Sequence, residues 1–475
     1  MTSQKRIAIL GAGPGGYVAA IRAAQLGARV TVVEREALGG VCLNWGCIPS
    51  KALLAAIELG DKLKKASEMG LTGLGTIGYD PVKMVARKQT VVSTLRRGVA
   101  TLLKSWNITH LEGRGELLDQ RTLRVVAPDG TATSVSADII ILATGSSWPN
   151  LPQFPIDGRQ IITSREALEL SVVPASLLII GGGVEGCEFA SLYSGLGAHV
   201  TVVELLPRLL PTEDEEISAL ITRELKKRGV EICTGTSVAT VERRAEFMTA
   251  TLKDGATVTG QQILVSVGRG FNSRDIGLEA VGVQLGRRGE VLVDESLQTN
   301  VPGIYAIGDV TGKSMLAHVA SAQGKVAAAH ALGHQARINY EVIPAGIFTL
   351  PEVGRVGLTE AQARSACETQ GGDPARDLKV GRFRYAASGK AQATGETTGL
   401  FKLIADGRTG MLLGAHIVGG HASDLIHEAA LAMEAGIPAS HVAAMIHAHP
   451  TLAEGLMEAA EDLDGDAIHV AKARA

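Results

Sequence analysis

The sequence has 475 residues, of which 45% are hydrophobic and 20% charged, with 57 glycines and a formal net charge of -3 at neutral pH. A chain of this length exceeds one ordinary core, so we expect two to four domains, and the composition is typical of a globular α/β protein and excludes a disordered one. The small net charge and the lack of a basic block give no reason to expect a nucleic-acid partner.

The N-terminus and the cysteine count indicate where the protein works. The first residues are polar and run directly into an apolar strand, without the charged-then-apolar pattern of a signal segment. We expect no apolar run long enough to cross a bilayer, and therefore no membrane partner. Five cysteines cannot form a disulfide scaffold in so long a chain. We expect a cytoplasmic protein in which a close cysteine pair is catalytic or metal-binding.

Two segments, residues 7–34 and 177–204, follow the same plan of apolar strand, glycine-rich turn, helix and second strand ending in an acid. Glycines let the backbone approach a pyrophosphate at the helix N-terminus, and the acid accepts hydrogen bonds from ribose hydroxyls. One such turn indicates only a tight bend, whereas two complete units predict two dinucleotide sites. The predicted contacts are Gly11, Gly13, Gly16 and Glu34 in the first unit and Gly181, Gly183, Gly186 and Glu204 in the second.

The second unit also carries the signals for nucleotide choice. Glu204 favours NAD over NADP, because a 2′-phosphate would meet like charge there. Arg208 weakens this inference, since an arginine can receive a 2′-phosphate. Glu185 places a carboxylate inside a turn suited to phosphates, and we expect its side chain to point outward.

A cysteine pair follows the first unit in Gly39-Gly-Val-Cys42-Leu-Asn-Trp-Gly-Cys47-Ile-Pro-Ser-Lys51. The two residues could be small buried hydrophobic groups, which is a common place for free cysteine. However, four intervening residues allow the sulfurs to approach within bonding distance at a helix start, whose dipole favours the thiolate. A structural zinc would need two further ligands at matched spacing, and we expect no metal because the other cysteines are scattered, at Cys187, Cys233 and Cys367.

A candidate base lies near the C-terminus, in His447-Ala-His449-Pro450-Thr451-Leu-Ala-Glu454. Histidine titrates near neutrality, and Glu454 at the start of the following helix could hold the His449 tautomer and stabilise its charged form. Thr451 and Glu454 also fit a helix capping box, which needs no chemistry. By spacing alone the two interpretations are about equally favoured.

The cysteine segment resembles the redox segment of the pyridine nucleotide-disulfide oxidoreductases and, within that family, of the dihydrolipoamide dehydrogenases. The likeness continues in order through Ala143-Thr-Gly145, Val267-Gly-Arg269, Ile307-Gly-Asp309 and Pro351-Glu-Val-Gly. It implies an α/β fold of two Rossmann-like FAD- and NAD-binding domains and an α+β C-terminal dimerisation domain. The implied division is 1–148 for the first part of the FAD domain, 149–273 for the NAD domain, 274–342 for the return to the FAD domain and 343–475 for the interface domain.

The same resemblance assigns roles to individual residues. FAD belongs to the first unit and NAD to the second, with Cys47 against the flavin and Cys42 exchanging with substrate. Lys51, one helical turn after Cys47, lies near the flavin and pairs with Glu188; a solvated surface lysine is the alternative. The further cofactor contacts that the family motifs imply are Thr144, Gly145, Gly268 and Asp309.

The histidine motif resembles the dihydrolipoamide dehydrogenases specifically. The resemblance implies that His449 and Glu454 form a dyad reaching the cysteines of the opposite subunit, which makes the protein a homodimer with shared sites. His447 and His318 are expected to be structural. Trp45 replaces a usually small aliphatic residue and Leu350 a common histidine, and either could reshape the substrate channel.

The predicted activity is oxidation of dihydrolipoamide, carried on a lipoyl-bearing partner protein, with reduction of NAD. Two alternatives stay open. One is a related NAD(P)H-dependent reductase of another small disulfide, and the other is a non-catalytic nucleotide-binding component of an assembly.

Overall fold

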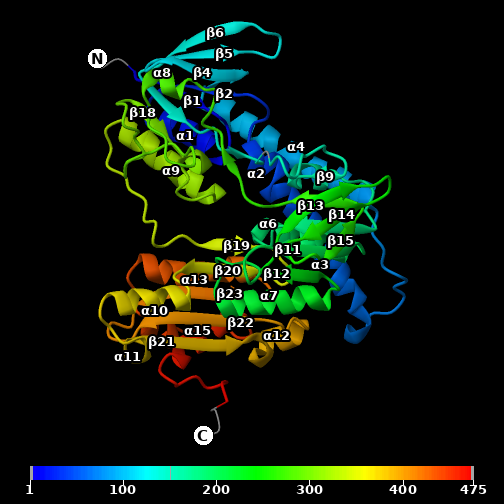
Figure 1. Cartoon of the computed structure of the whole chain (residues 1–475). Helices are drawn as coiled ribbons and strands as arrows, with labels where there is room; N and C mark the ends of the chain where they lie inside the picture. Colours follow the sequence, from blue (N-terminus) through cyan, green and yellow to red (C-terminus); the bar gives the residue numbers. More distant parts are fainter. Residues whose placement is uncertain (1–3, 150, 472–475) are drawn as a thin grey trace.

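The computed structural model describes residues 4–149 and 151–471, and Figure 1 shows three sheet-centred regions. The first region is built on a parallel sheet of five strands in the order β18-β7-β1-β2-β3. Strands β1 and β7 are buried along nearly their whole length, as expected when a parallel sheet is covered on both faces. The strands are β1 (Arg6–Leu10), β2 (Arg29–Glu34), β3 (Thr109–Glu112), β7 (Ile139–Leu142) and β18 (Ile304–Ala306).

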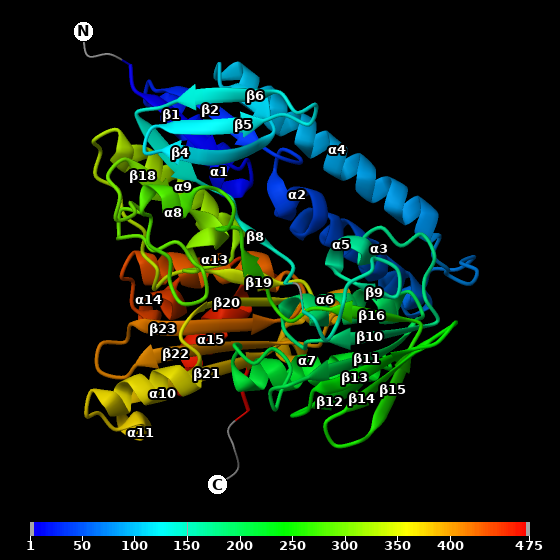
Figure 2. The same ribbon diagram turned by 45° about the horizontal axis from the view of Figure 1, so that its top comes forward.

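Helices α1 (Pro14–Gln25) and α9 (Ala317–Ala331) pack closely against each other beside this sheet. Their approach requires Gly324, where a Cβ would lie 2.5 Å from the Gly15 carbonyl oxygen. The long helix α4 (Pro81–Ser105) extends between the two regions, with its C-terminal end at the first region, where it leads into β3 (Figure 2). A small antiparallel sheet and short helices complete the region: β4 (Arg114–Asp119), β5 (Thr122–Val126), β6 (Ala132–Ser136), α8 (Leu278–Val281), η1 (Ala66–Met69) and η2 (Gly308–Thr311).

The second region repeats the first, with a parallel sheet in the order β12-β11-β10-β16-β9. The pair β8–β17 lies where the chain crosses between the two regions. The elements are β8 (Ser146–Ser147), β9 (Ile161–Ile162), α5 (Ser164–Ala167), β10 (Ser176–Ile180), α6 (Val184–Gly195), β11 (His199–Glu204), α7 (Glu215–Lys227), β12 (Glu231–Thr234), β13 (Val238–Arg243), β14 (Met248–Leu252), β15 (Thr257–Gly260), β16 (Gln262–Val265) and β17 (Gly270–Phe271).

The C-terminal region has an antiparallel sheet in the order β19-β20-β23-β22-β21, at the bottom of Figure 1. Helix α13 packs on β20 and β23, and α15 on β21 and β22. The elements are β19 (Ala345–Ile347), β20 (Val353–Gly357), α10 (Glu360–Thr369), α11 (Pro374–Asp377), β21 (Leu378–Arg384), η3 (Tyr385–Ala387), α12 (Gly389–Thr394), β22 (Leu400–Asp406), β23 (Leu412–Val418), α13 (Ala422–Glu434), α14 (Ala439–Ala444) and α15 (Glu454–Asp462).

This arrangement confirms the predicted α/β class with two dinucleotide-type sheets and an α+β C-terminal domain. The first sheet draws strands from residues 6–142 and again from 304–306, so the chain leaves the first region and returns to it. The predicted boundaries at residues 148, 273 and 342 stay predictions.

One expectation about the apolar segments is wrong. The segment Gly40–Lys64 is long and apolar enough to cross a membrane, judged by its length and composition only. In the structure Gly46 divides it into α2 (Gly40–Trp45) and α3 (Cys47–Lys64). Leu53 and Ile57 of α3 pack in a core shared with the second and third sheets, so the apolar face of α3 joins the three regions.

Candidate active site

The first glycine turn has the geometry of a nucleotide cradle. Gly11 has φ +103°, and a Cβ there would lie 2.2 Å from the Ala143 carbonyl oxygen. A Cβ on Gly16 would lie 1.9 Å from the Gly11 oxygen, so only glycine fits where α1 begins. The Glu34 carboxylate accepts hydrogen bonds from the backbone N–H groups of Ala12 (2.8 Å) and Glu36 (2.9 Å). These bonds fix the acid at the carboxyl end of β2.

The second turn repeats this geometry almost atom for atom. Gly181 has φ +109°, and a Cβ there would lie 2.1 Å from the Ser266 oxygen. A Cβ on Gly186 would lie 2.0 Å from the Gly181 oxygen. Glu204 accepts the N–H of Gly182 (2.6 Å) and of Leu206 (2.8 Å). The helices α1 and α6 both start after a glycine, Gly13 or Gly183, that contributes no side-chain cap.

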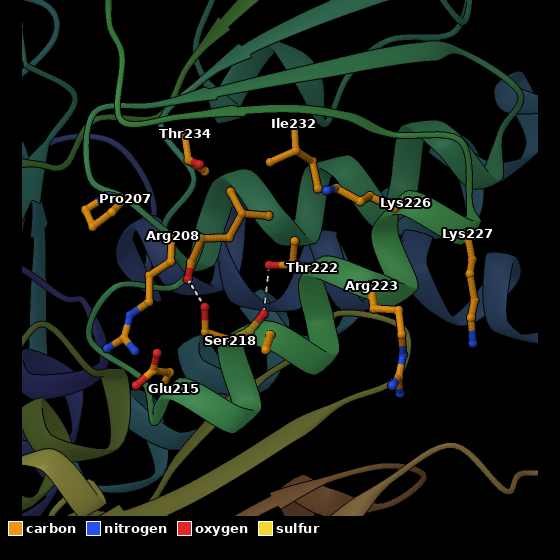
Figure 3. Close-up of a pocket in the computed structure, with 12 residues that line it drawn as sticks. Pro207, Arg208, Glu215, Ser218, Thr222, Arg223, Lys226, Lys227, Ile232 and Thr234 are labelled. Carbon is orange, nitrogen blue, oxygen red and sulfur yellow. Dashed lines mark hydrogen bonds between the residues drawn. The ribbon is translucent and has the colours of Figure 1, made fainter.

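Arg208, the residue that weakened the NAD assignment, is held by its own loop. Its guanidinium donates hydrogen bonds to the carbonyl oxygens of Pro211 (3.1 Å) and Glu213 (3.0 Å). Figure 3 shows it at the wall of a pocket of about 760 Å³ between this loop and α7, near Glu215. Arg208 is therefore committed to backbone acceptors, which favours the NAD interpretation of Glu204.

Glu185 differs from its expectation. It is half-buried, and its Oε2 accepts a hydrogen bond from the Ser266 hydroxyl at 3.0 Å. The expectation that this side chain points outward is wrong, because the hydroxyl after β16 offers a donor within reach of the first turn of α6.

The two cysteines meet at the break between α2 and α3. Both cysteines are free in the structure. Hydrogen bonding with Cys47, followed by burial, raises the pKa of Cys42. Hydrogen bonding from Cys42 is the largest effect on Cys47 and lowers its pKa; burial opposes it, and the positive charge of Lys51 adds a smaller lowering effect. The pair is therefore polarised, because the thiolate is favoured on Cys47 and the thiol on Cys42.

Lys51 and Glu188 meet from two domains, as the resemblance implied. Lys51 Nζ lies 2.7 Å from Glu188 Oε2, and Glu188 Oε1 accepts the backbone N–H of Phe348 at 2.9 Å. The Lys51 ammonium also lies 4.5 Å from the centre of the Phe348 ring. Glu188 is buried and Lys51 is partly buried, so the pair is shielded more than a surface ion pair. A solvated lysine is excluded.

The family motifs between and after the two units converge at the β8–β17 crossing. The Asn272 side chain donates to the Thr144 carbonyl oxygen at 2.9 Å, and the Asn272 N–H donates to the Gly145 oxygen at 3.0 Å. Ser146 Oγ donates to Asp309 Oδ2 at 2.5 Å and accepts from Arg269 Nε at 2.7 Å. Asp309 is thus oriented by the crossing itself.

Two glycines at the same crossing leave space for a ligand. Gly145 and Gly268 have φ +69° and +105°, and a Cβ on either would meet no atom within 4 Å. Together with the two glycine turns and their fixed acids, the open backbone fits two dinucleotides.

His449 and Glu454 form a pair in the C-terminal region. His449 Nδ1 lies 2.8 Å from Glu454 Oε1, and Glu454 Oε2 accepts the Thr451 N–H at 2.8 Å. Burial acts to raise the pKa of Glu454, but the bonds from Thr451 and His449 outweigh it and lower the pKa. The Thr451 hydroxyl donates to the Ala448 oxygen instead of capping α15, so only half of the predicted capping box forms.

In a single chain the pair is not joined to the cysteines. The His449 side chain is 77% exposed, and its hydrogen bond within the described residues runs to Glu454. Nearby Ile446 is 96% exposed. The base is therefore presented outward from the surface of its own chain.

The other residues named from the sequence motifs also have defined contacts in the structure. His447 is buried between Glu428 Oε1 (2.9 Å from Nε2) and the Met445 oxygen (3.0 Å from Nδ1). His318 Nε2 lies 2.7 Å from the Pro344 oxygen. The Trp45 ring carries the Arg165 guanidinium 4.3 Å from its centre, and Leu350 packs against the core that joins the three sheets.

Comparison with known proteins agrees with this geometry. Residues 5–324 match the family model described as pyridine nucleotide-disulphide oxidoreductase, and residues 343–460 match its dimerisation domain. The chain belongs to the pyridine nucleotide-disulphide oxidoreductase family. The match confirms the predicted family and its use of FAD and NAD.

Individual relatives cover nearly the whole chain. The dihydrolipoyl dehydrogenase of Bacillus subtilis (strain 168) is 43% identical, over 98% of this chain and 97% of its own length. That of Geobacillus stearothermophilus is 42% identical, over 97% of each. Among solved structures, LpdA from Mycobacterium tuberculosis has a TM-score of 0.89 at 32% identity, over 97% of this chain and 99% of its own. The HOCl-induced flavoprotein disulfide reductase RclA from Escherichia coli has a TM-score of 0.84 at 27% identity, over 96% and 99%.

The sequence interpretation missed some residues that complete the site. Phe348 fixes Glu188 through its N–H and covers Lys51 with its ring, although it lies 160 residues away. Sequence spacing holds no signal for this contact. Ser146 follows the motif Ala143-Thr-Gly145, and Arg269 ends the motif Val267-Gly-Arg269. Their polar side chains in two motifs of one family are the signal that could have predicted the contact between them.

Proposed function

We infer that this protein is a flavoprotein that oxidises dihydrolipoamide to lipoamide and reduces NAD⁺ to NADH. The observation that carries the inference is the polarised cysteine pair one helical turn before the Lys51–Glu188 ion pair. A cysteine with a depressed pKa is the better leaving group in thiol–disulfide exchange. The pair is therefore built to exchange at Cys42 and to leave at Cys47.

The substrate half-reaction follows from this polarity. In the oxidised enzyme Cys42 and Cys47 share a disulfide, and a substrate thiolate attacks the Cys42 sulfur. The Cys42–Cys47 bond breaks, Cys47 leaves as a thiolate, and a mixed disulfide joins substrate and Cys42. The second substrate sulfur then attacks its own mixed disulfide, which closes lipoamide and releases Cys42.

The protons and electrons balance in this sequence. Two electrons pass from the dithiol to the cysteine pair. One substrate proton goes to Cys42, whose pKa is raised, and the other goes to the His449 base. The product is a Cys42 thiol beside a Cys47 thiolate. This form is favoured because the pKa of Cys42 is raised and that of Cys47 is lowered. Glu454 holds the imidazole through its Nδ1 atom.

The chain's residues also define where the cofactors would be held. Gly11, Gly16, Glu34 and Asp309 would hold FAD, which when bound supplies the two-electron carrier between the thiolate and the nicotinamide. Gly181, Gly186 and Glu204 would hold NAD. Lys51, ion-paired with Glu188, places a fixed positive charge beside the Cys47 sulfur and favours its thiolate.

We propose that His449 and Glu454 serve the cysteines of a second subunit. The support is the exposure of His449 in one chain, the exposed Ile446 beside it and the match to a dimerisation domain. The lipoyl group would arrive on a partner protein. A cytoplasmic location stays a prediction.

The test uses purified holoenzyme and a substrate panel. With dihydrolipoamide, NAD⁺ reduction is expected in the wild type, and loss below detection in Cys47→Ser with flavin still bound. Turnover is expected to be retained in the control Cys367→Ser, a partly buried cysteine outside the site. NADH and NADPH are then each assayed with lipoamide and other small disulfides. Full turnover by Cys47→Ser would refute the mechanism, and greater activity on another disulfide would refute the substrate.

A further inference from the structure

Glu185 is a carboxylate placed within a glycine turn that the proposed function assigns to a dinucleotide. It is the second residue of α6, half-buried, and held by the Ser266 hydroxyl at 3.0 Å. The first unit of the chain has Gly15 at the matching position. Dinucleotide binding as such therefore needs no side chain at this position.

The contacts of Glu188, a neighbour on α6, show how close Glu185 lies to the cysteine pair. Glu188 follows three residues later on α6, so the two carboxylates lie on the same side of the helix. Glu188 binds Lys51, which lies one turn after Cys47 on α3. Glu185 is therefore about one turn of α6 away from the residue that contacts Lys51 beside the cysteine pair.

The opposite end of the nucleotide is fixed by Glu204. This acid closes β11 and accepts two backbone N–H groups, and its remaining acceptor capacity suits the hydroxyls of the adenosine ribose. An NAD whose adenosine lay at Glu204 and whose pyrophosphate lay at the α6 N-terminus would have its nicotinamide end on the side of Glu188 and Lys51. Glu185 lies between the glycine turn and Glu188 on α6, so it would lie beside the nicotinamide half of that nucleotide.

A carboxylate beside the nicotinamide would respond to the charge of the nicotinamide ring. NAD⁺ carries a cationic nicotinamide and NADH a neutral one, whereas their pyrophosphates and riboses are the same. A half-buried carboxylate interacts with a nearby charge more strongly than an exposed one. The bond from Ser266 occupies Oε2 and keeps the carboxylate beside β16, which leaves Oε1 available to the nucleotide.

We propose that Glu185 is a specificity-determining residue that favours NAD⁺ over NADH by placing its carboxylate beside the nicotinamide ring. The proposal rests on the proposed function, because it assumes NAD in the second unit. Its consequence is directional: weaker retention of the neutral product promotes NADH release and lessens product inhibition during dithiol oxidation.

The test measures binding to oxidised holoenzyme by isothermal titration calorimetry, without turnover. Three probes divide the nucleotide: NAD⁺, the redox-inert 1,4,5,6-tetrahydro-NAD with a neutral ring, and ADP-ribose without a ring. In Glu185→Gln we expect roughly tenfold weaker NAD⁺ binding, about 1.4 kcal/mol, with the other two probes within twofold of wild type. The matched control, Glu224→Gln on α7, removes the same charge from the same domain beside Lys227 and is expected to change none of the three.

The possible results separate the proposal from its premise. Unchanged NAD⁺ affinity in Glu185→Gln overturns the proposal, and so does an equal gain for all three probes, which would mean repulsion of the pyrophosphate. A wild-type holoenzyme that binds none of the probes would instead refute the assignment of NAD to the second unit.

Discussion

Replacing Cys42 by alanine is expected to shift the ionisation of Cys47 upward, and more than replacing Lys51 by methionine. Hydrogen bonding from Cys42 is the main cause of the lowered Cys47 pKa, whereas Lys51 acts through charge and is opposed by Glu188. A hydrogen bond to a charged group contributes about 1.5–3 kcal/mol, and one pKa unit corresponds to about 1.36 kcal/mol. The lower end, roughly one pH unit, is expected because Lys51 still favours the Cys47 thiolate after Cys42 is removed.

The assay is the rate of iodoacetamide alkylation of Cys47 in reduced holoenzyme as a function of pH, since only the thiolate reacts. The midpoint is expected to rise by roughly one pH unit in Cys42→Ala and by about half as much in Lys51→Met. The exposed lysine variant Lys83→Met, on α4, serves as the control. An unchanged midpoint in Cys42→Ala, or a larger shift in Lys51→Met, would refute the idea that the cysteines polarise each other.

Three further changes test other parts of the structure. Glu454→Gln is expected to lower kcat for dithiol oxidation by roughly 100-fold, because the imidazole loses the carboxylate that holds it; stopped-flow reduction would show an unchanged rate if the pair is only structural. Gly186→Ala is expected to abolish NAD binding measured by calorimetry, since its Cβ would lie 2.0 Å from the Gly181 oxygen. Lys402→Met is expected to lower the free energy of unfolding in urea by about 3–5 kcal/mol, because it leaves buried Asp214 unpaired. Burial acts to raise the pKa of Asp214, but bonds from Lys402 outweigh it and lower the pKa, so the stabilisation is present above the ordinary carboxylate pKa and lost as pH falls through the lowered value. The difference between wild type and Lys402→Met should therefore shrink in acid, and a difference that grows in acid would contradict this assignment.

Much of the site could be predicted because its residues act within short segments. The turns at Gly11 and Gly181 and the acids at Glu34 and Glu204 are local patterns whose geometry follows from backbone sterics. The cysteine pair likewise needs only the helix break at Gly46. The Glu185 side chain differs from its expectation, because its partner Ser266 lies just after β16, 81 residues away in the chain.

The sequence by itself determined the two nucleotide units, the redox pair and the histidine–glutamate pair, since each is set by spacing within one turn or one helix. Only the tertiary structure decided which distant groups tune them: Phe348 on Glu188, Arg269 on Ser146, and the loop carbonyls that hold Arg208. Hydrogen bonds between segments far apart in the chain depend on how whole sheets pack, and no periodicity within a segment encodes that packing.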